Sequence, residues 1–257
     1  MASELKIALI QSQLHWENPV ANRAMFSKKI ATIPKDTELI VLPEMFTTGF
    51  TMNPQNIDSA EAAKTIAWMQ QIAQEKSAAI TGSIVFTEKD KNFNRLFFCF
   101  PDGELAVYDK KHTFTLAGED KVYEAGITKL LVSYKGFKIQ PMICYDLRFP
   151  VWARNTEDYD VLIYVANWPK PRIDAWDALL KARAIENMSY CIGVNRIGLD
   201  GLGYEYSGHS AVYDVLGHRT AYSEKEEITY ANLDKKHIKS MREKLRFLED
   251  RDDFNLV

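Results

Sequence analysis

An apolar run turns polar at Cys144 within the stretch Ile139-Gln140-Pro141-Met142-Ile143-Cys144-Tyr145-Asp146-Leu147-Arg148-Phe149-Pro150. The apolar residues predict a buried strand, and the polar residues after them predict its exit from a sheet. Enzymes with α/β folds keep their reactive groups at such strand ends. A thiol becomes a nucleophile only with a base nearby, so the rest of the chain decides whether Cys144 is reactive.

Short apolar runs and amphipathic patterns alternate along the whole chain. Apolar residues at helical spacing predict helices around residues 26–33, 66–73, 176–188 and 238–248. Pro101-Asp102-Gly103 and Lys135-Gly136 each lie between two apolar runs and predict hairpin turns. Strands are expected over residues 5–10, 38–42, 79–86, 95–100, 105–108, 130–134, 137–144, 161–166, 190–195, 209–214 and 228–233.

These elements predict a single α/β domain over residues 1–257, built as a layered sandwich with helices on both sides of the strands. The mixture of hairpins and crossovers excludes a purely parallel sheet. The glycine-rich segment 198–203 lacks the phosphate-loop pattern and is expected to be a loop. Residues 234–257 form a C-terminal extension, whose amphipathic helix contacts either its own domain or a partner subunit.

The composition is that of an ordinary soluble globular protein, with 46% hydrophobic and 26% charged residues. A formal net charge of −3 without a Lys/Arg stripe argues against nucleic-acid binding. No apolar run approaches the roughly 20 residues of a membrane span, and residues 5–10 are too short for a signal peptide. Three cysteines without framework spacing favour a reducing compartment, so the cytoplasm is expected. Five histidines without a pair at metal-ligand spacing argue against a metal site.

Residues whose side chains can take part in catalysis follow four of the expected strands. Glu44, Cys144 and Asn167 each follow one apolar run, and a fourth run leads to Lys110 and Lys111. If these strands are neighbours with a common orientation, a carboxylate, an ammonium and a thiol meet at one rim. That set suffices for covalent acyl transfer, because the carboxylate removes the thiol proton and the ammonium stabilises the oxyanion.

Each of these residues also has a purely structural interpretation. Buried cysteines usually behave as small hydrophobes, which is the expected state of Cys99 and Cys191. A glutamate or lysine at a strand end is more often solvated, and physical reasoning alone does not choose between Lys110 and Lys111. His112 is open as a catalytic partner for the thiol, although a structural histidine is the simpler interpretation.

Three strand-end motifs, taken in order, resemble the nitrilase superfamily of carbon–nitrogen hydrolases. They are Pro43-Glu44-Met45-Phe46, Tyr108-Asp109-Lys110-Lys111-His112 and Cys144-Tyr145-Asp146-Leu147-Arg148-Phe149-Pro150. The order Glu, Lys, Cys is the signature of that superfamily, and the resemblance extends from Ile7 to the end of the chain. It implies a four-layer α-β-β-α sandwich whose subunits pair, at least as homodimers.

The resemblance also implies roles for particular residues. Cys144 is the implied nucleophile and Glu44 the implied general base. The catalytic lysine of the motif lies two residues before the histidine, which selects Lys110. Glu119 stands seven residues before a glycine, as a second family glutamate often does, and is implied to orient Lys110 and the substrate. The backbone N–H of Tyr145 is implied to complete the oxyanion hole, and no external cofactor is required.

Longer strings resemble one branch of the superfamily, the bacterial omega-amidases or 2-oxoglutaramate amidases. They are residues 43–50 (PEMFTTGF), 167–169 (NWP) and 182–187 (ARAIEN). The implied substrates are the small-molecule amides 2-oxoglutaramate and 2-oxosuccinamate, hydrolysed to the acid and ammonia through a thioester on Cys144. The alternatives are another amidase of the superfamily, acting on carbamoyl compounds or aliphatic amides, and a catalytically silent scaffold.

A substrate with a free carboxylate needs a cationic or N–H-rich subsite at the far end of its pocket. Arg148 and Arg172 are the candidates for that subsite, although Arg148 as readily pairs with an acid and Arg172 as readily faces water. Further candidates for the substrate pocket are Phe46, Phe50, Asn167 and Trp168.

Overall fold

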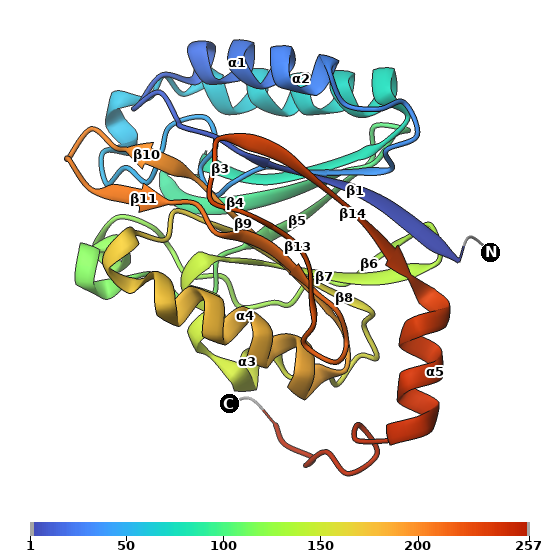
Figure 1. The fold of residues 1–257 in the computed structure, drawn as a ribbon. Coiled ribbons are helices and arrows are strands. Elements are labelled where there is room, and N and C mark those ends of the chain that lie inside the picture. The colour runs from blue at the N-terminus through green and yellow to red at the C-terminus, as the bar shows by residue number, and fades with distance from the viewer. Residues whose placement is uncertain (1–2, 256–257) are drawn as a thin grey trace.

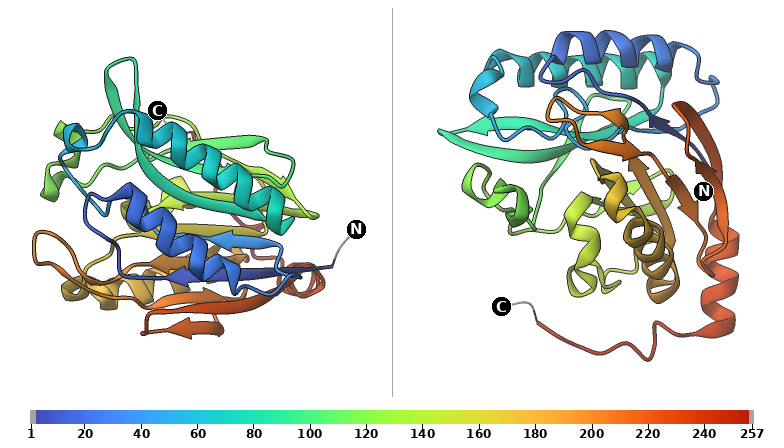
Figure 2. Two further views of the ribbon diagram at one scale, coloured as in Figure 1. Left: turned by 90° about the horizontal axis from the view of Figure 1, so that it is seen from above. Right: turned by 60° about the vertical axis from the view of Figure 1, so that its left-hand side comes forward.

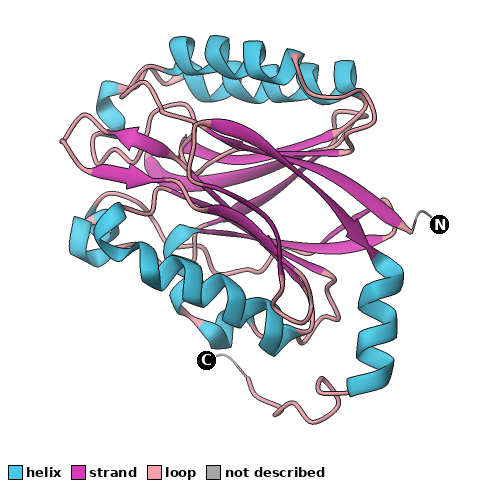
Figure 3. Ribbon diagram, in the orientation of Figure 1, coloured by secondary structure: helices cyan, strands magenta, loops and turns pink. Residues whose placement is uncertain are grey.

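Two β-sheets packed face to face form the centre of the molecule, and helices cover their outer faces (Figures 1 and 3). The structure, a computed structural model, describes residues 3–255. The four layers confirm the predicted α-β-β-α sandwich, and the mixed strand directions confirm that the sheets are not purely parallel. No helix within residues 3–255 is long and apolar enough to cross a membrane.

The first sheet has parallel strands at its centre and antiparallel strands toward its edges. Its order is β14 (Glu227–Asp234), β1 (Glu4–Gln11), β2 (Leu39–Val41), β3 (Ala79–Glu88), β4 (Lys91–Cys99) and β5 (Leu105–Asp109). Strands β1, β2 and β3 run parallel, whereas β14, β4 and β5 are each antiparallel to a neighbour. Helices α1 (Pro19–Ala31) and α2 (Ala60–Lys76) lie side by side over the outer face of this sheet (Figure 2).

The second sheet repeats this plan. Its order is β13 (Arg219–Ser223), β12 (Ser210–Tyr213), β9 (Tyr190–Asn195), β8 (Val161–Ala166), β7 (Phe137–Ile143) and β6 (Val132–Tyr134). Strands β7, β8 and β9 run parallel, and the remaining pairs are antiparallel. Helices α3 (Pro150–Ala153) and α4 (Ile173–Asn187) lie on its outer face (Figure 1).

Burial on both faces explains why the central strands are continuous apolar runs. In β1, Ile7 and Leu9 join the core that lies between the sheets, whereas Ala8 and Ile10 join the core beneath α1 and α2. A strand covered on both sides has no solvent face and therefore no alternation of polar and apolar residues. The periodicity that located α1 and α2 arises from their single buried stripe, which includes Phe26.

Several short elements were not expected from the sequence. Of the glycine-rich segment 198–203, which was expected to be a loop, residues 198–199 belong to β10 (Ile197–Leu199) and residues 200–203 form the turn to β11 (Glu205–Ser207). Strands β10 and β11 form a separate two-stranded sheet. Strand β13 was also missed, because two of its five residues are exposed and its sequence has no apolar run. Short 3-10 helices complete the fold: η1 (Pro54–Asn56), η2 (Thr115–Ala117), η3 (Glu119–Lys121), η4 (Cys144–Arg148) and η5 (Lys170–Arg172).

The C-terminal helix α5 (Lys235–Leu245) docks on its own domain. Ile238 is 1% exposed and belongs to the main core. The Arg242 guanidinium donates to the backbone carbonyl of Met188 at 2.8 Å and to that of Tyr159 at 2.5 Å. These contacts show that the helix packs on its own domain, and contact of the extension 234–257 with a partner subunit stays a prediction.

The four polar strand ends do not come from one sheet. Glu44 and Lys110 follow β2 and β5 of the first sheet, whereas Cys144 and Asn167 follow β7 and β8 of the second. β2 and β5 have the same direction, because β3 is parallel to β2 and two antiparallel steps separate β3 from β5. The ends meet where the two sheets face each other, not along the rim of one sheet.

Candidate active site

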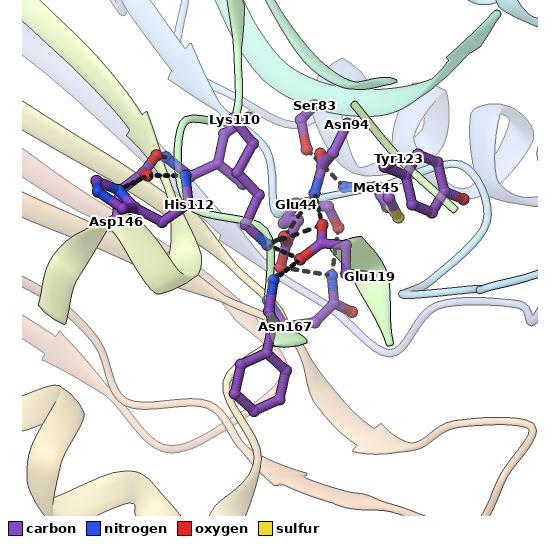
Figure 4. Close-up of polar contacts among 12 residues, drawn as sticks. Glu44, Met45, Ser83, Asn94, Lys110, His112, Glu119, Tyr123, Asp146 and Asn167 are labelled. Atoms are coloured by element: carbon purple, nitrogen blue, oxygen red, sulfur yellow. Dashed lines mark hydrogen bonds and ion pairs between the residues drawn. The ribbon is translucent and has the colours of Figure 1, made fainter. Parts of the chain in front are cut away.

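Glu44 lies just beyond β2, fully buried at 0% exposure. Its Oε1 accepts hydrogen bonds from Lys110 Nζ and Asn94 Nδ2, each at 2.8 Å (Figure 4). Its Oε2 accepts from the backbone N–H of Asn167 at 2.8 Å, and the Asn167 side-chain amide donates to the Glu44 backbone carbonyl at 2.6 Å. Burying a carboxylate is costly unless it is paired and hydrogen-bonded, and these donors meet that requirement.

Lys110 follows β5 and is 1% exposed. Its ammonium lies 2.8 Å from Glu44 Oε1 and 3.0 and 2.8 Å from the two carboxylate oxygens of Glu119. Burial by itself lowers the pKa of the Lys110 ammonium, but the negative charges of Glu119 and Glu44 outweigh burial and raise that pKa above its usual value. Lys110 is therefore a fixed cation between two carboxylates.

Glu119 is on η3 and is 0% exposed. Its Oε2 accepts a hydrogen bond from the backbone N–H of Phe114 at 2.6 Å, which ties the carboxylate to its own loop. Burial raises the pKa of the Glu119 carboxyl, Lys110 lowers it, and the charge of Glu44 raises it again. The structure thus brings together the two glutamates and the lysine that the sequence singled out.

Cys144 stands where β7 ends and η4 begins, with a φ of +42°. Such a left-handed backbone is strained for a residue other than glycine, and Asp146 stabilises the turn by accepting from the Ile143 N–H at 3.0 Å. The side chain of Cys144 is partly exposed and opens into a pocket. Burial raises the pKa of the thiol well above its usual value, Glu44 raises it further and Lys110 opposes them. The thiol is therefore protonated at neutral pH and needs a base.

His112 braces the turn after Cys144. Its Nδ1 lies 2.7 Å from Asp146 Oδ1, and its backbone N–H donates to the same oxygen at 3.0 Å. Its ring stacks on Phe149 with 3.6 Å between centroids. The Tyr108 hydroxyl donates to the other oxygen of Asp146 at 2.8 Å. These contacts correspond to the structural interpretation of His112.

A pocket of about 150 Å³ opens above Cys144. Its wall includes Lys110 and the predicted residues Phe50, Tyr145, Arg148, Asn167, Trp168 and Arg172. The guanidinium of Arg148 lies over the Trp168 ring at 4.8 Å, and that of Arg172 lies over the Phe114 ring at 5.3 Å. Neither arginine forms an ion pair with a carboxylate within residues 3–255. The N–H donors of both guanidinium groups are thus available to a ligand in the pocket.

Two residues of the motifs, Phe46 and Lys111, lie outside this pocket. Phe46 was a candidate for its wall, but it is 0% exposed and packs against Phe26 and Trp68 on the helix side of the first sheet. The expectation for Phe46 is corrected, because its side chain leaves the backbone on the face opposite to the pocket. The Lys111 ammonium lies over the Trp152 ring at 5.2 Å, so the contacts of the two lysines single out Lys110.

Sequence reasoning missed several residues of the site. Asn94 on β4 donates to both Glu44 and Glu119. No sequence signal marked it, because it precedes the apolar run 95–100 and lies in the polar half of the strand. The remaining missed residues of the wall come from loops, from η2 and from β11, where no periodic pattern marks them: Phe114, Leu116, Ala117, Pro169, Tyr204 and Tyr206. Within the described residues, no group of three or more His, Cys, Asp or Glu side chains is arranged to hold a metal ion.

The chain matches the carbon-nitrogen hydrolase family over residues 6–243, and it belongs to that family. The omega-amidase YafV of Yersinia enterocolitica is 40% identical over 99% of this chain and 100% of its own length. The 2-oxoglutaramate amidase of Bacillus subtilis is 30% identical, covering 95% of this chain and 96% of its own. A CN-hydrolase superfamily protein of Xanthomonas campestris, with an arsenic adduct in its active site, is 37% identical with a TM-score of 0.96 over 100% of both chains. The family predicted from the three motifs is confirmed.

Proposed function

We propose that the protein is an omega-amidase, which hydrolyses the terminal amide of small 2-oxo dicarboxylic acid monoamides to the acid and ammonia. One observation carries the chemistry: the Cys144 thiol opens into the same pocket as the Lys110 ammonium, which is bonded to the Glu44 carboxylate. The relatives called omega-amidase and 2-oxoglutaramate amidase support 2-oxoglutaramate and 2-oxosuccinamate as the substrates.

The first half of the reaction forms a thioester. Glu44 takes the proton of the Cys144 thiol, and the thiolate adds to the amide carbon. The oxyanion accepts hydrogen bonds from the Lys110 ammonium and from the backbone N–H of Tyr145. When this intermediate collapses, the carbon–nitrogen bond breaks and the nitrogen takes the proton from Glu44, so that ammonia leaves.

The second half reverses the proton movements with water as the nucleophile. Glu44 removes a proton from a water molecule, which adds to the thioester carbon. The same two donors stabilise the second oxyanion. Collapse breaks the carbon–sulfur bond, the proton on Glu44 returns to Cys144, and the carboxylic acid leaves. Glu119 holds the Lys110 ammonium in place through both half-reactions.

Arg148 and Arg172 are the proposed partners of the substrate carboxylate. Both are in the pocket wall, where their guanidinium groups lie over aromatic rings and, within residues 3–255, form no ion pair with a carboxylate. Guanidinium groups bind carboxylates through paired N–H donors, which favours an acidic substrate over a neutral aliphatic amide. Phe50, Asn167 and Trp168 complete the proposed binding residues, with Asn167 also holding Glu44.

Two other functions compete with this proposal. A carbamoyl or aliphatic amide hydrolase uses the same thiol chemistry on a substrate with a different acyl group. A catalytically silent scaffold leaves unexplained why three buried charged groups surround a partly exposed thiol.

Ammonia release from a panel of compounds tests the substrate assignment. The panel contains 2-oxoglutaramate, 2-oxosuccinamate, glutamine, a carbamoyl amino acid, an aliphatic amide and a nitrile. We expect the two 2-oxo acid amides to have the highest kcat/KM, because only they combine a terminal amide with a 2-oxo acid group. Turnover of the carbamoyl compound or the nitrile alone would contradict the assignment.

A matched pair of variants sharpens this panel. Arg172→Gln removes a guanidinium from the pocket wall, whereas Lys170→Gln removes an exposed cation from the same 3-10 helix, where it pairs with Glu205 at 2.8 Å. We expect Arg172→Gln to raise KM for 2-oxoglutaramate about 10-fold, the effect of losing one charged hydrogen bond. The aliphatic amide should be unaffected, and Lys170→Gln should change neither.

We also propose that the protein works in the cytoplasm as a homodimer or larger homo-oligomer. Exposed apolar side chains on the outer helices, such as Val151 on α3 and Ile185 on α4, support subunit pairing. Sedimentation velocity measures the oligomeric state directly, and a single species with the 29.5 kDa mass of the monomer would contradict pairing.

A further inference from the structure

Asn94 contacts all three charged residues of the proposed active site, although it belongs to none of the sequence motifs. It lies on β4 and is 1% exposed. Its side-chain Nδ2 lies 2.8 Å from Glu44 Oε1 and 3.1 Å from Glu119 Oε1 (Figure 4). Its backbone carbonyl accepts from the N–H of Lys110 at 3.1 Å. One residue of the strand thus holds the base, the second glutamate and the lysine.

The arrangement of charges creates a problem that the mechanism must solve. Glu44 and Glu119 share the single ammonium of Lys110, so two carboxylates lie close together in a buried site. Such a pair ordinarily takes up a proton, because two like charges side by side do not both remain ionised. A protonated Glu44 cannot accept the proton of Cys144.

N–H donors between the two Oε1 atoms solve this problem. Each Oε1 atom accepts one hydrogen bond from Lys110 and one from Asn94. The amide of Asn94 does not ionise, so it supplies hydrogen bonds to both carboxylates without supplying a proton that they could keep. Hydrogen bonds to the charged form of a carboxylate favour that form.

The same contacts also select the oxygen that receives the thiol proton. Oε1 of Glu44 already accepts two hydrogen bonds, from Lys110 and Asn94. Oε2 accepts a short hydrogen bond only from the backbone N–H of Asn167 at 2.8 Å, with the Asn167 side-chain amide at 3.4 Å. Oε2 is therefore the oxygen with capacity for the proton of Cys144.

We propose that Asn94 is a positioning residue that keeps the Glu44 and Glu119 carboxylates ionised side by side and leaves Glu44 Oε2 as the proton acceptor. This inference rests on the proposed function, because it assigns Asn94 a part in the proton transfer from Cys144. Among the described residues, the buried Oδ1 of Asn94 has no hydrogen-bond partner, so its side-chain contacts are made through the donor end.

The experiment measures the rate at which iodoacetamide alkylates Cys144 as a function of pH, with peptide mapping to identify the labelled cysteine. The change is Asn94→Leu, which keeps the branched shape and the number of side-chain heavy atoms but has no donor. Since a carboxylate that loses a hydrogen bond has a higher pKa, the acid limb of the alkylation profile should move up by about 1 pH unit. Asn94→Ser retains one donor and should move the limb in the same direction by less.

Asn92→Ala is the matched control, because Asn92 is two residues away on the same strand and contacts Thr87 at the surface. The proposal is overturned if the limb of Asn94→Leu stays in place, if Asn92→Ala moves it equally, or if the rate falls by one factor at every pH. If Asn94→Leu fails to fold by circular dichroism, Asn94→Ser decides alone, and an unmoved limb again overturns the proposal.

Alkylation is measured without substrate, so the two proposals fail separately. A wild-type protein that releases no ammonia from 2-oxoglutaramate contradicts the substrate assignment but leaves the alkylation shift intact. If Asn94→Leu turns over 2-oxoglutaramate normally and the acid limb of its kcat/KM profile against pH does not move, only the role proposed for Asn94 is contradicted.

Discussion

The three cysteines differ because of their neighbours, not because of their chemistry. Cys99 and Cys191 are 0% exposed, and burial is the largest cause that raises the pKa of both thiols. Cys144 also has a raised pKa, but it opens into a pocket beside Glu44 and Lys110. We therefore expect the reactivity of Cys144 to depend on a partner that removes its proton, rather than on a thiolate that already exists.

Glu44→Gln tests this dependence on a base. The amide side chain has nearly the shape of the carboxylate but does not accept the thiol proton. Because a general base contributes about 10²–10⁴-fold, we expect amide turnover and Cys144 alkylation to fall by at least about 100-fold. Ammonia release and mass spectrometry of the labelled peptides measure the two effects.

The control for this change is Glu124→Gln, which alters an exposed glutamate paired with Lys91 at 3.4 Å. It should leave both rates unchanged. Substantial residual turnover in Glu44→Gln would remove Glu44 from the role of base. Faster labelling of Cys99 or Cys191 than of Cys144 would contradict the whole assignment of the nucleophile.

At the scale of elements, the chain that follows η3 packs against the end of β5 at Gly126, seven residues after Glu119. The N–H of Gly126 donates to the Lys110 backbone carbonyl at 2.8 Å. A Cβ added to Gly126 would lie 2.1 Å from the backbone carbonyl oxygen of Asp109. The chain thus passes directly against the end of β5, and only a residue without a side chain fits there.

Gly126→Ala tests this contact. The added methyl group has to displace backbone atoms beside Lys110, so we expect a destabilisation of about 1–3 kcal/mol together with a fall in kcat/KM. Urea unfolding and ammonia release measure the two quantities. Ala125→Ser, an exposed neighbour, should change neither, and equal behaviour of the two variants would show that the close approach is unimportant.

At the scale of the whole molecule, the site exists only because two sheets pack together. The first sheet supplies Glu44 and Lys110, and the second supplies Cys144 and Asn167. The hydrogen bonds between Glu44 and Asn167 join one sheet to the other at the site. Loosening of the sandwich should therefore separate the base from the nucleophile before either sheet unfolds.

Alkaline pH should destabilise the fold through its buried thiols. Burial raises the pKa of Cys99 from 9.0 to about 11. A group whose folded pKa is raised contributes stability below its unfolded pKa, and this is lost as pH rises toward the folded value. The Cys99 contribution should therefore disappear between about pH 9 and pH 11, a loss of at most about 3 kcal/mol.

Urea unfolding of the wild type and of Cys99→Ala at several values of pH tests this effect. The variant starts less stable, because it lacks a buried sulfur atom, but its unfolding free energy should fall less steeply above pH 9. The difference in slope isolates Cys99 from the tyrosines and lysines that titrate in the same range. Parallel curves for the two proteins would contradict the prediction.

Sequence alone was sufficient for most of the fold, because burial leaves a periodic trace. The continuous apolar runs of β1, β3, β7, β8 and β9 and the single stripes of α1 and α2 all lie where the patterns predicted them. Elements without that trace were missed, namely β13 and the hairpin of β10 and β11. Strands β10 and β11 have only three residues each, most of them at least partly exposed, so they have no period to detect.

For the site, the sequence by itself indicated which chemical groups to expect. Strand ends pointed to Glu44 and Cys144, and the family resemblance selected Lys110 over Lys111 and added Glu119. Only the tertiary structure decided which groups touch. It showed that Phe46 packs under the helices and that Asn94 joins the two glutamates. The reason is physical: a one-dimensional pattern records which face of an element is buried, whereas hydrogen bonds between side chains from two sheets depend on how those sheets are stacked and aligned.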